Sequence, residues 1–225
     1  MKGRRRAAVW TIVNIRSHSG GTPITPKTAP GLKHQTSEGL FLALRLVSFS
    51  ETLNLTMPTA HGGADMNDIG AALDAFARIG IGRHGKSLLV DSSGPQLTSV
   101  LRNVLAAIEE SPIPDQEWVP LTTLLGDELV SRTVGSSISS VQRYRNHERP
   151  TPDDIAARLH TVALIVADLA GSYNGFGIRR WFQRPRSVLG GQAPAEVLSG
   201  DWSPDDESVR TVRDLARSLL GSAST

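Results

Sequence analysis

The sequence predicts a mainly α-helical protein, a helix-turn-helix-like helical bundle with a small helical domain at its C-terminus. Two observations carry this prediction. After Asp65, apolar residues recur at steps of three and four, as they do along one face of an amphipathic helix. Residues 151–154 and 203–206 also repeat one helix-start signal, a hydroxyl residue, a proline and two acids. Leu88–Val90 is an exception, because this short apolar run suits a strand or an extended segment.

Composition and charge exclude several classes of protein and of binding site. The 225 residues include no cysteine, which excludes disulfides and thiolate metal sites and fits a reducing compartment. The net charge is only +2, so a uniformly basic nucleic-acid coat is excluded. The most apolar run, Leu40–Val47, is interrupted by Arg45 and is far shorter than the ~18 residues of a membrane span. We therefore expect a cytoplasmic protein without a membrane partner.

Residues 1–64 are predicted to be a disordered basic tail. No acidic residue precedes Glu38, and residues 19–31 are rich in glycine and proline without a hydrophobic period. Within this tail, residues 37–56 have the composition for one helical or strand segment. A start codon assigned too far upstream explains the same features, with Met57 or Met66 as the true first residue, and this alternative stays open.

Residues 65–116 are predicted to be a small helical segment with one short strand-like run. Ile69, Leu73 and Phe76 lie at helical spacing, and this helix is expected to end near Gly80. A second helix follows residue 95 and stops at the proline-bounded linker of residues 111–114, the best candidate for a domain boundary. Its apolar face is formed by Leu97, Val100, Leu101, Val104, Leu105 and Ile108.

Residues 117–170 have the outline of a helix-turn-helix followed by a connecting helix. Short helical patterns at 127–134 and 138–146 flank a glycine-serine break, and Val141 and Tyr144 are expected to face inward. Glutamine, arginine and serine side chains can contact base edges and phosphates. The alternative is an ordinary packing unit with a solvated arginine face. The candidate DNA-binding residues are Ser139, Ser140, Gln142, Arg143 and Arg145.

Residues 171–225 contain a stretch, Trp181–Leu198, that combines two aromatics, two prolines and a Gly-Gly pair. Proline fixes φ and glycine allows positive φ, so this stretch predicts two short helices joined by a turn of defined shape. Aromatics beside four nearby arginines can stack bases or form a protein–protein interface, and the prolines and glycines favour a fixed protein-facing surface over a flexible groove for a nucleic-acid strand. The alternative is that the aromatics are core and the arginines are solvated. These arginines are Arg179, Arg180, Arg184 and Arg186.

Residues 80–87 match the phosphate-binding loop pattern GxxxxGK[ST]. In that loop a strand enters and a helix leaves, so that backbone N–H groups point at the phosphates. Here a helical pattern enters and an apolar run leaves, so a nucleotide-binding enzyme is the least favoured of the functions considered. Elsewhere the sequence contains no nucleophile motif, and its histidines are not paired at a metal-binding spacing. Neither enzymatic activity nor a cofactor is therefore predicted.

The C-terminal stretch is similar to a known family. Its pattern, Trp-Phe-x-x-Pro-x-x-x-Leu-Gly-Gly-x-x-Pro-x-x-x-Leu from Trp181 to Leu198, resembles the C-terminal toxin-binding domain of the Xre/MbcA/ParS antitoxins. That domain commonly reads W-L-x-x-P-N-x-x-L-G-G-x-x-P-x-x-x-L and ends with a last helix. Residues 134–169 are similar to the Xre-like helix-turn-helix of the same family. The resemblance covers residues 117–221, almost half of the chain.

The resemblance implies the antitoxin of a type II toxin–antitoxin pair. Its partner would be a RES-domain toxin, an enzyme that consumes NAD, bound as part of a hetero-oligomer. Operator DNA would be bound by a homodimer through the helix-turn-helix; a stand-alone transcriptional regulator is the alternative. Arg186 stands where the family often has Asn, and Trp202 is expected to be an interface anchor. The residues carried over to the toxin-binding domain are Trp181, Arg184, Pro185, Arg186, Leu189, Gly190, Gly191, Gln192 and Pro194.

Overall fold

The computed structural model describes residues 37–58, 64–85 and 94–222. Every regular element in these ranges is a helix, which confirms the mainly α-helical prediction. The strand expected at Leu88–Val90 lies outside the described residues. The elements are α1 (Ser37–Thr52), α2 (Met66–Arg78), α4 (Gly94–Glu109), α5 (Pro114–Leu125), α6 (Asp127–Val134), α7 (Ile138–Arg145), α8 (Asp153–Ala170), α9 (Gly175–Gln183), η1 (Ser187–Leu189), α10 (Pro194–Val197) and α11 (Glu207–Ser222).

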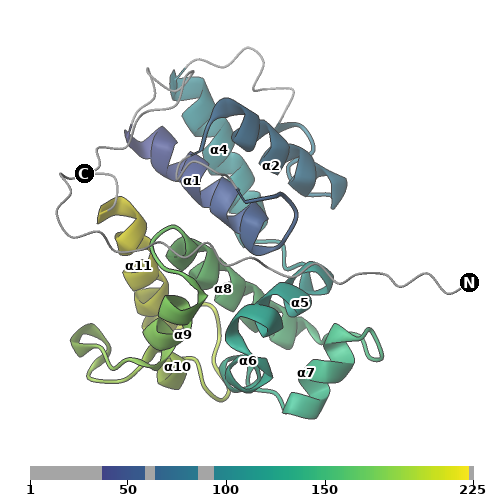
Figure 1. Cartoon of the computed structure of the whole chain (residues 1–225), viewed down its shortest axis with the longest axis vertical. Coiled ribbons are helices and arrows are strands. Elements are labelled where there is room, and N and C mark those ends of the chain that lie inside the picture. The colour runs from purple at the N-terminus through teal and green to yellow at the C-terminus, as the bar shows by residue number, and fades with distance from the viewer. Residues whose placement is uncertain (1–36, 59–63, 86–93, 223–225) are drawn as a thin grey trace, which may run out of the picture.

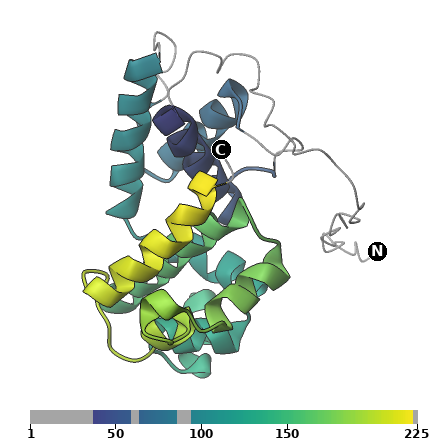
Figure 2. The same ribbon diagram turned by 90° about the vertical axis from the view of Figure 1, so that its left-hand side faces the viewer.

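The helices form two groups that share one hydrophobic core. Helices α1, α2 and α4 gather in the upper part of Figure 1, and the other helices lie below them. Helix α8 runs through the middle, with nearly all of its residues buried, and packs against α1, α5, α6 and α11. In Figure 2 the last helix, α11, lies against α8 and extends toward the upper group. The core is continuous across the linker at residues 111–114, from Leu42 to Ala216.

Helix α1 lies in the part of the predicted tail, residues 37–56, whose composition suits one helical or strand segment, so the disordered tail does not extend over this helix. Leu42, Leu46 and Phe49 follow one another at steps of four and three, and all three are buried against α2, α4 and α8. Arg45, which interrupts the apolar run, is buried as well because it is paired with carboxylates. Residues 1–36 lie outside the described residues.

Local chemistry explains where several helices begin. Asp65 caps α2 by accepting hydrogen bonds from the backbone N–H groups of Asn67 and Asp68, and the Asp68 carboxylate accepts one from the N–H of Asp65. Helix α8 has two acids in its first turn, as predicted, but it begins directly after Pro152, so the proline is the N-cap and the hydroxyl before it does not cap the helix. Helix α11 begins at Glu207 instead of within residues 203–206, because those residues form a turn in which the Asp206 carboxylate accepts from the Ser203 N–H.

Candidate functional site

The first candidate surface is the helix-turn-helix of α6 and α7. Helix α6 ends at Gly135, whose φ of 69° lies in the left-handed region. A Cβ at this position would lie 2.4 Å from the carbonyl oxygen of Gly200, so the turn requires glycine both for its φ and for this close approach. Ser137 then starts α7 by accepting a hydrogen bond from the Ser140 N–H. The break between the two helices is therefore a fixed corner.

The inner face of α7 holds this helix on the core. Val141 and Tyr144 are both buried, so the side chains expected to face inward do so. The Tyr144 ring stacks on Trp118 of α5 with ring centroids 5.6 Å apart, and the Trp118 indole N–H donates to the Thr151 hydroxyl at 2.9 Å. Helix α7 lies at the lower edge of the molecule in Figure 1, with its other face toward solvent.

The outer face of α7 contains only part of the predicted set. Ser139, Gln142 and Arg143 are exposed, and Asn146, which was not predicted, completes a row at positions i, i+3, i+4 and i+7. Ser140 is half-buried and accepts a hydrogen bond from the Ser137 hydroxyl. Arg145 is half-buried as well. The i+7 step from Ser139 was the signal in the sequence that points to Asn146.

Arg145 is turned toward α6, where it forms an ion pair with Asp127 at 2.7 Å. The same carboxylate accepts a hydrogen bond from the Gln142 amide at 3.1 Å. Residues 114–154 hold four arginines, no lysines and seven acidic residues, so this unit has no broad basic surface. Within this unit, DNA contacts would therefore depend on the exposed polar side chains of α7 and not on a broad basic surface.

The second candidate surface is the turn between α9 and α10. Helix α9 is capped by Asn174, which accepts a hydrogen bond from the Gly177 N–H. Gly190 and Gly191 have φ values of 64° and 86°, so the Gly-Gly pair provides two successive residues with positive φ, as the sequence predicted for a shaped turn. The Arg186 N–H donates to the Gln192 carbonyl, and the Gly191 N–H donates to the Arg186 carbonyl, each at 2.9 Å. These two bonds close the turn.

Apolar side chains fix this turn on the core. Trp181 and Phe182 are buried and meet edge to face, with ring centroids 5.3 Å apart. Leu189 and Pro194 are buried as well. The Arg186 guanidinium lies 5.6 Å from the centre of the Trp181 ring, which ties the turn to α9 through a cation–π contact.

The remaining motif residues lie on the outer side of the turn. Arg184, Pro185 and Gln192 are exposed, as are both glycines, Gly190 and Gly191. The outer side also carries Val188, which is 59% exposed and was not among the predicted contacts. The residues of the motif thus separate into a buried group that fixes the backbone path and an exposed group that is available to a partner.

Trp202 is not an interface anchor, and the expectation that it contacts a partner is wrong. It is 6% exposed, and its indole N–H donates to the carbonyl oxygens of Thr133 and Leu198, each at 2.9 Å. Arg158 lies beside it and donates to the Trp202 carbonyl at 2.8 Å. Trp202 therefore joins the segment that follows α10 to the end of α6 within this chain.

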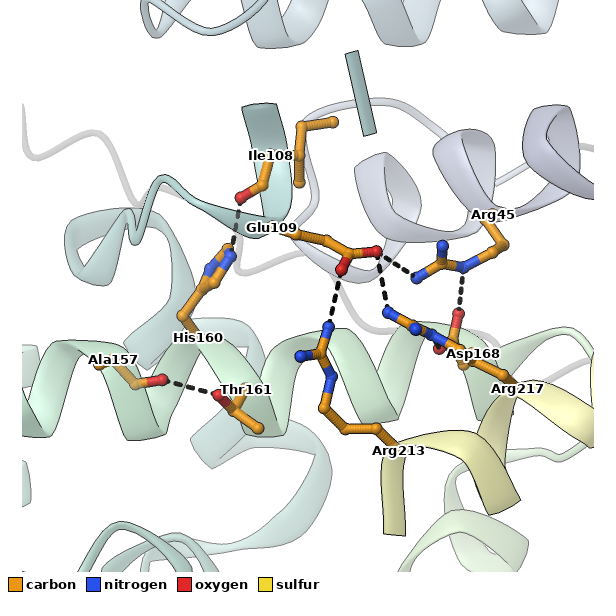
Figure 3. A network of polar contacts seen from close by, with 9 residues as sticks. All are labelled: Arg45, Ile108, Glu109, Ala157, His160, Thr161, Asp168, Arg213 and Arg217. Carbon is orange, nitrogen blue, oxygen red and sulfur yellow. Dashed lines mark hydrogen bonds and ion pairs between the residues drawn. The ribbon is translucent and has the colours of Figure 1, made fainter. Parts of the chain in front are cut away.

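Figure 3 shows a network of charged side chains between the upper helices and α11. The Glu109 carboxylate accepts from Arg45, Arg213 and Arg217 at 3.1, 2.9 and 2.8 Å, and Arg45 also donates to Asp168 at 2.9 Å. These five residues come from α1, α4, α8 and α11. Arg45 is only 8% exposed, so its charge depends on these partners.

Burial and pairing shift the pKa values of this network in different directions. Burial raises the pKa of Glu109, but the charges of Arg217, Arg45 and Arg213 outweigh burial and hold it below its ordinary value. Burial raises the pKa of Asp168 above its ordinary value, because Arg45 compensates for it only in part. Burial and the nearby charge of Arg217 lower the pKa of Arg213.

A second buried polar pair lies where α4, α5 and α8 meet. His160 Nδ1 lies 2.5 Å from the Glu117 carboxyl, and His160 Nε2 donates to the Ile108 carbonyl at 2.8 Å. Burial raises the pKa of Glu117 above its ordinary value. His160 also meets the ring of Phe49 edge-on, so the pair links the helix-turn-helix unit to α1. It touches neither of the two candidate surfaces.

The phosphate-loop pattern of residues 80–87 lies only partly within the described residues. A helix, α2, precedes Gly80, but Lys86 and Ser87 of the phosphate-loop pattern lie outside the described residues. Within the three described ranges, histidine, aspartate and glutamate side chains nowhere form a group of three with metal-site geometry. None of the helices described is both long and apolar enough to cross a membrane.

Comparisons with known proteins add no relative. No family model, no curated protein and no solved structure matches the chain.

Proposed function

We propose that the chain is the antitoxin of a type II toxin–antitoxin pair, a cytoplasmic protein that neutralises a RES-domain toxin by direct binding. The C-terminal turn would bind the toxin, an enzyme that consumes NAD, and the helix-turn-helix would bind operator DNA as a homodimer or within a toxin–antitoxin complex. Each role is assigned to a separate surface.

The observation that carries the proposal is the closed turn of residues 184–192. Two successive glycines with positive φ are needed to form it, and buried aromatics hold it in place. Its outer side presents Arg184, Val188 and Gln192 to solvent. Arginine is enriched at protein–protein interfaces, so an exposed arginine beside an exposed apolar residue suits a surface that meets another protein.

Co-expression with the protein encoded by the adjacent gene tests the toxin-binding role. We expect the full chain to restore growth and to co-purify with that protein. Replacing both Arg184 and Gln192 with Ala should weaken the complex at least tenfold, because both side chains would lose their contacts with the toxin. The fold should be retained, because these exposed side chains do not hold the turn. Failure of the unaltered chain both to restore growth and to co-purify would reject the antitoxin role.

A matched control separates binding from general effects of charge. Arg78 is an exposed arginine on α2, far along the chain from the turn, and Arg78→Ala should leave co-purification unchanged. Thermal melting of each variant checks that its fold is retained. If Arg78→Ala weakens the complex as much as the paired substitution does, binding does not depend on the turn surface.

The helix-turn-helix favours a second candidate function, a stand-alone transcriptional regulator. Its supporting observation is the exposed row of Ser139, Gln142, Arg143 and Asn146 on a helix held at a fixed corner. Arg143→Ala should weaken operator binding and leave toxin binding intact if the two surfaces are separate. A chain that binds operator DNA but no product of a neighbouring gene would favour the regulator.

A further inference from the structure

We infer that Asp127 sets the base specificity of α7, because it aligns Gln142 toward DNA and holds Arg145 away from it. The inference rests on the DNA-binding part of the proposed function. It assigns Asp127 as a positioning residue that does not itself read a base.

One carboxylate joins the two helices of the corner. Asp127 is the first residue of α6, and its Oδ1 accepts a hydrogen bond from Arg145 at 2.7 Å, while its Oδ2 accepts one from the Gln142 amide nitrogen at 3.1 Å. Both oxygens are therefore engaged by α7. A single residue on the first helix fixes two side chains on the second.

For Arg145, this contact means that it is not free to read bases. It lies outside the exposed row of α7, it is half-buried, and its charge is already paired with Asp127. Arg143, three residues before Asn146 in the exposed row, has no ion pair among the residues described. An unpaired arginine can donate two hydrogen bonds to guanine, so Arg143 is the guanidinium suited to direct readout.

For Gln142, the contact fixes the amide. A free glutamine presents either end of its amide, whereas reading adenine needs the oxygen and the nitrogen together in one orientation. The bond to Asp127 uses one N–H and leaves the second N–H and the amide oxygen of this exposed side chain available. Gln142 is then aligned before DNA arrives, which lowers the entropy cost of a specific contact.

Removing Asp127 should change non-specific DNA affinity and base specificity in opposite directions. Its negative charge lies beside the surface that would meet phosphates, so its removal should strengthen non-specific binding and free Arg145 for a phosphate contact. The same change should release Gln142 and weaken discrimination at one base pair. A general loss of structure would lower both quantities, so the opposite signs distinguish positioning from folding.

Selection from a random duplex library tests the inference with the full chain and four variants. The wild type should prefer one base at the position facing Gln142 by at least about fivefold. Asp127→Ala and Gln142→Ala should both reduce this preference to within about twofold, at the same position. In Asp127→Ala the slope of log affinity against log salt should also steepen by about one. Arg145→Ala should leave every base preference unchanged.

Glu128 supplies the matched control. It is the next residue of α6 and is exposed, so Glu128→Ala removes the same charge without touching Gln142. It should raise non-specific affinity modestly and leave base preference unchanged, and melting curves should show all variants folded. A wild type that enriches no sequence overturns DNA binding and the inference together. A wild type that enriches a motif that Asp127→Ala retains overturns the inference alone.

Discussion

Two seams hold this molecule together, and they use different chemistry. The charged seam, between the upper helices and α8 with α11, consists of Arg45, Glu109, Asp168, Arg213 and Arg217. In this seam three guanidinium groups share two carboxylates, and Glu109 alone accepts from all three. Each charge depends on groups that titrate or can be removed by one substitution.

The backbone seam, between α6, α8 and residues 198–202 after α10, relies mainly on neutral acceptors. Arg158 donates to the Trp202 carbonyl, and the Trp202 indole donates to the carbonyls of Thr133 and Leu198. Its one carboxylate, Asp201, pairs with Arg158, but its side chain is 98% exposed and is screened by water. Gly135 lets the Gly200 backbone approach closely here.

The backbone seam depends on the shape of the contacting groups, whereas the charged seam depends on their charge. Backbone carbonyls do not titrate, so the backbone seam should hold residues 198–202 against α6 and α8 across a wide pH range. The charged seam attaches the upper helices and α11 through groups whose pKa values are shifted by one another. The first seam should therefore fail when its shape changes, and the second when its charge changes.

Trp202→Ala should give the largest effect, because it breaks the backbone seam by shape. It removes a buried indole and leaves the Thr133 and Leu198 carbonyls without this donor. The free energy of unfolding should fall by about 3–5 kcal/mol, measured by urea denaturation. Trp202→Phe keeps an aromatic ring and loses the N–H, so it should cost less. Equal losses for the two variants would show that the hydrogen bonds matter more than the bulk of the ring.

Glu109→Ala should break the charged seam with the next largest effect. Arg45, Arg213 and Arg217 would lose their shared acceptor, and the free energy of unfolding should fall by about 3 kcal/mol. Glu109→Gln retains an acceptor oxygen and should lose less. Asp115→Gln, an exposed acid on α5, is the control and should change stability by under about 0.5 kcal/mol.

The stability difference between the wild type and Glu109→Gln should depend on pH. The pKa of Glu109 is lower in the folded state than in the unfolded state, so its stabilisation is present above the unfolded pKa and is lost as the pH falls through the folded pKa. The stability difference between the wild type and Glu109→Gln should therefore shrink below about pH 4. A difference that stays constant down to pH 2 would contradict the charge-based account of this seam.

The sequence predicted elements well where their evidence is local. The inner face of α7 and the Gly-Gly turn both follow from spacing and from φ restrictions within a few residues, and the structure has Val141, Tyr144 and the positive φ angles where they were expected. The start of α8 after Pro152 is local in the same sense.

What the sequence did not predict depends on partners far along the chain. Arg45 interrupts the Leu40–Val47 run, and its burial in the core depends on Asp168, which pairs with it from 123 residues away. Trp202 looked like an exposed anchor because its acceptor on Thr133 lies 69 residues away. Arg145 was predicted to face DNA, and only the crossing of α6 and α7 brings it to Asp127. Such pairs follow from tertiary packing, which periodicity does not specify.

Glu117→Gln should have the smallest effect on stability and the sharpest effect on its pH dependence. This substitution tests whether Glu117 and His160 are both neutral in the folded protein. Since the Ile108 carbonyl only accepts, His160 Nε2 carries a hydrogen, and one further proton lies between Nδ1 and Glu117. Burial raises the pKa of Glu117, which favours the protonated carboxyl as the donor to Nδ1. A glutamine amide can donate in the same place, so the change at low pH should be under about 1.5 kcal/mol.

An acid whose pKa is raised on folding contributes stability that is fully present below its unfolded pKa and is lost as the pH rises toward the folded value. The wild type should therefore lose stability relative to Glu117→Gln as the pH rises above about 4, in urea titrations at a series of pH values. Glu110→Gln, at an exposed neighbouring acid, should show no such trend. Parallel profiles for the wild type and Glu117→Gln would mean that Glu117 is ionised beside His160. The interior would then contain a second buried charged contact, between α5 and α8, and only the backbone seam would consist mainly of neutral groups.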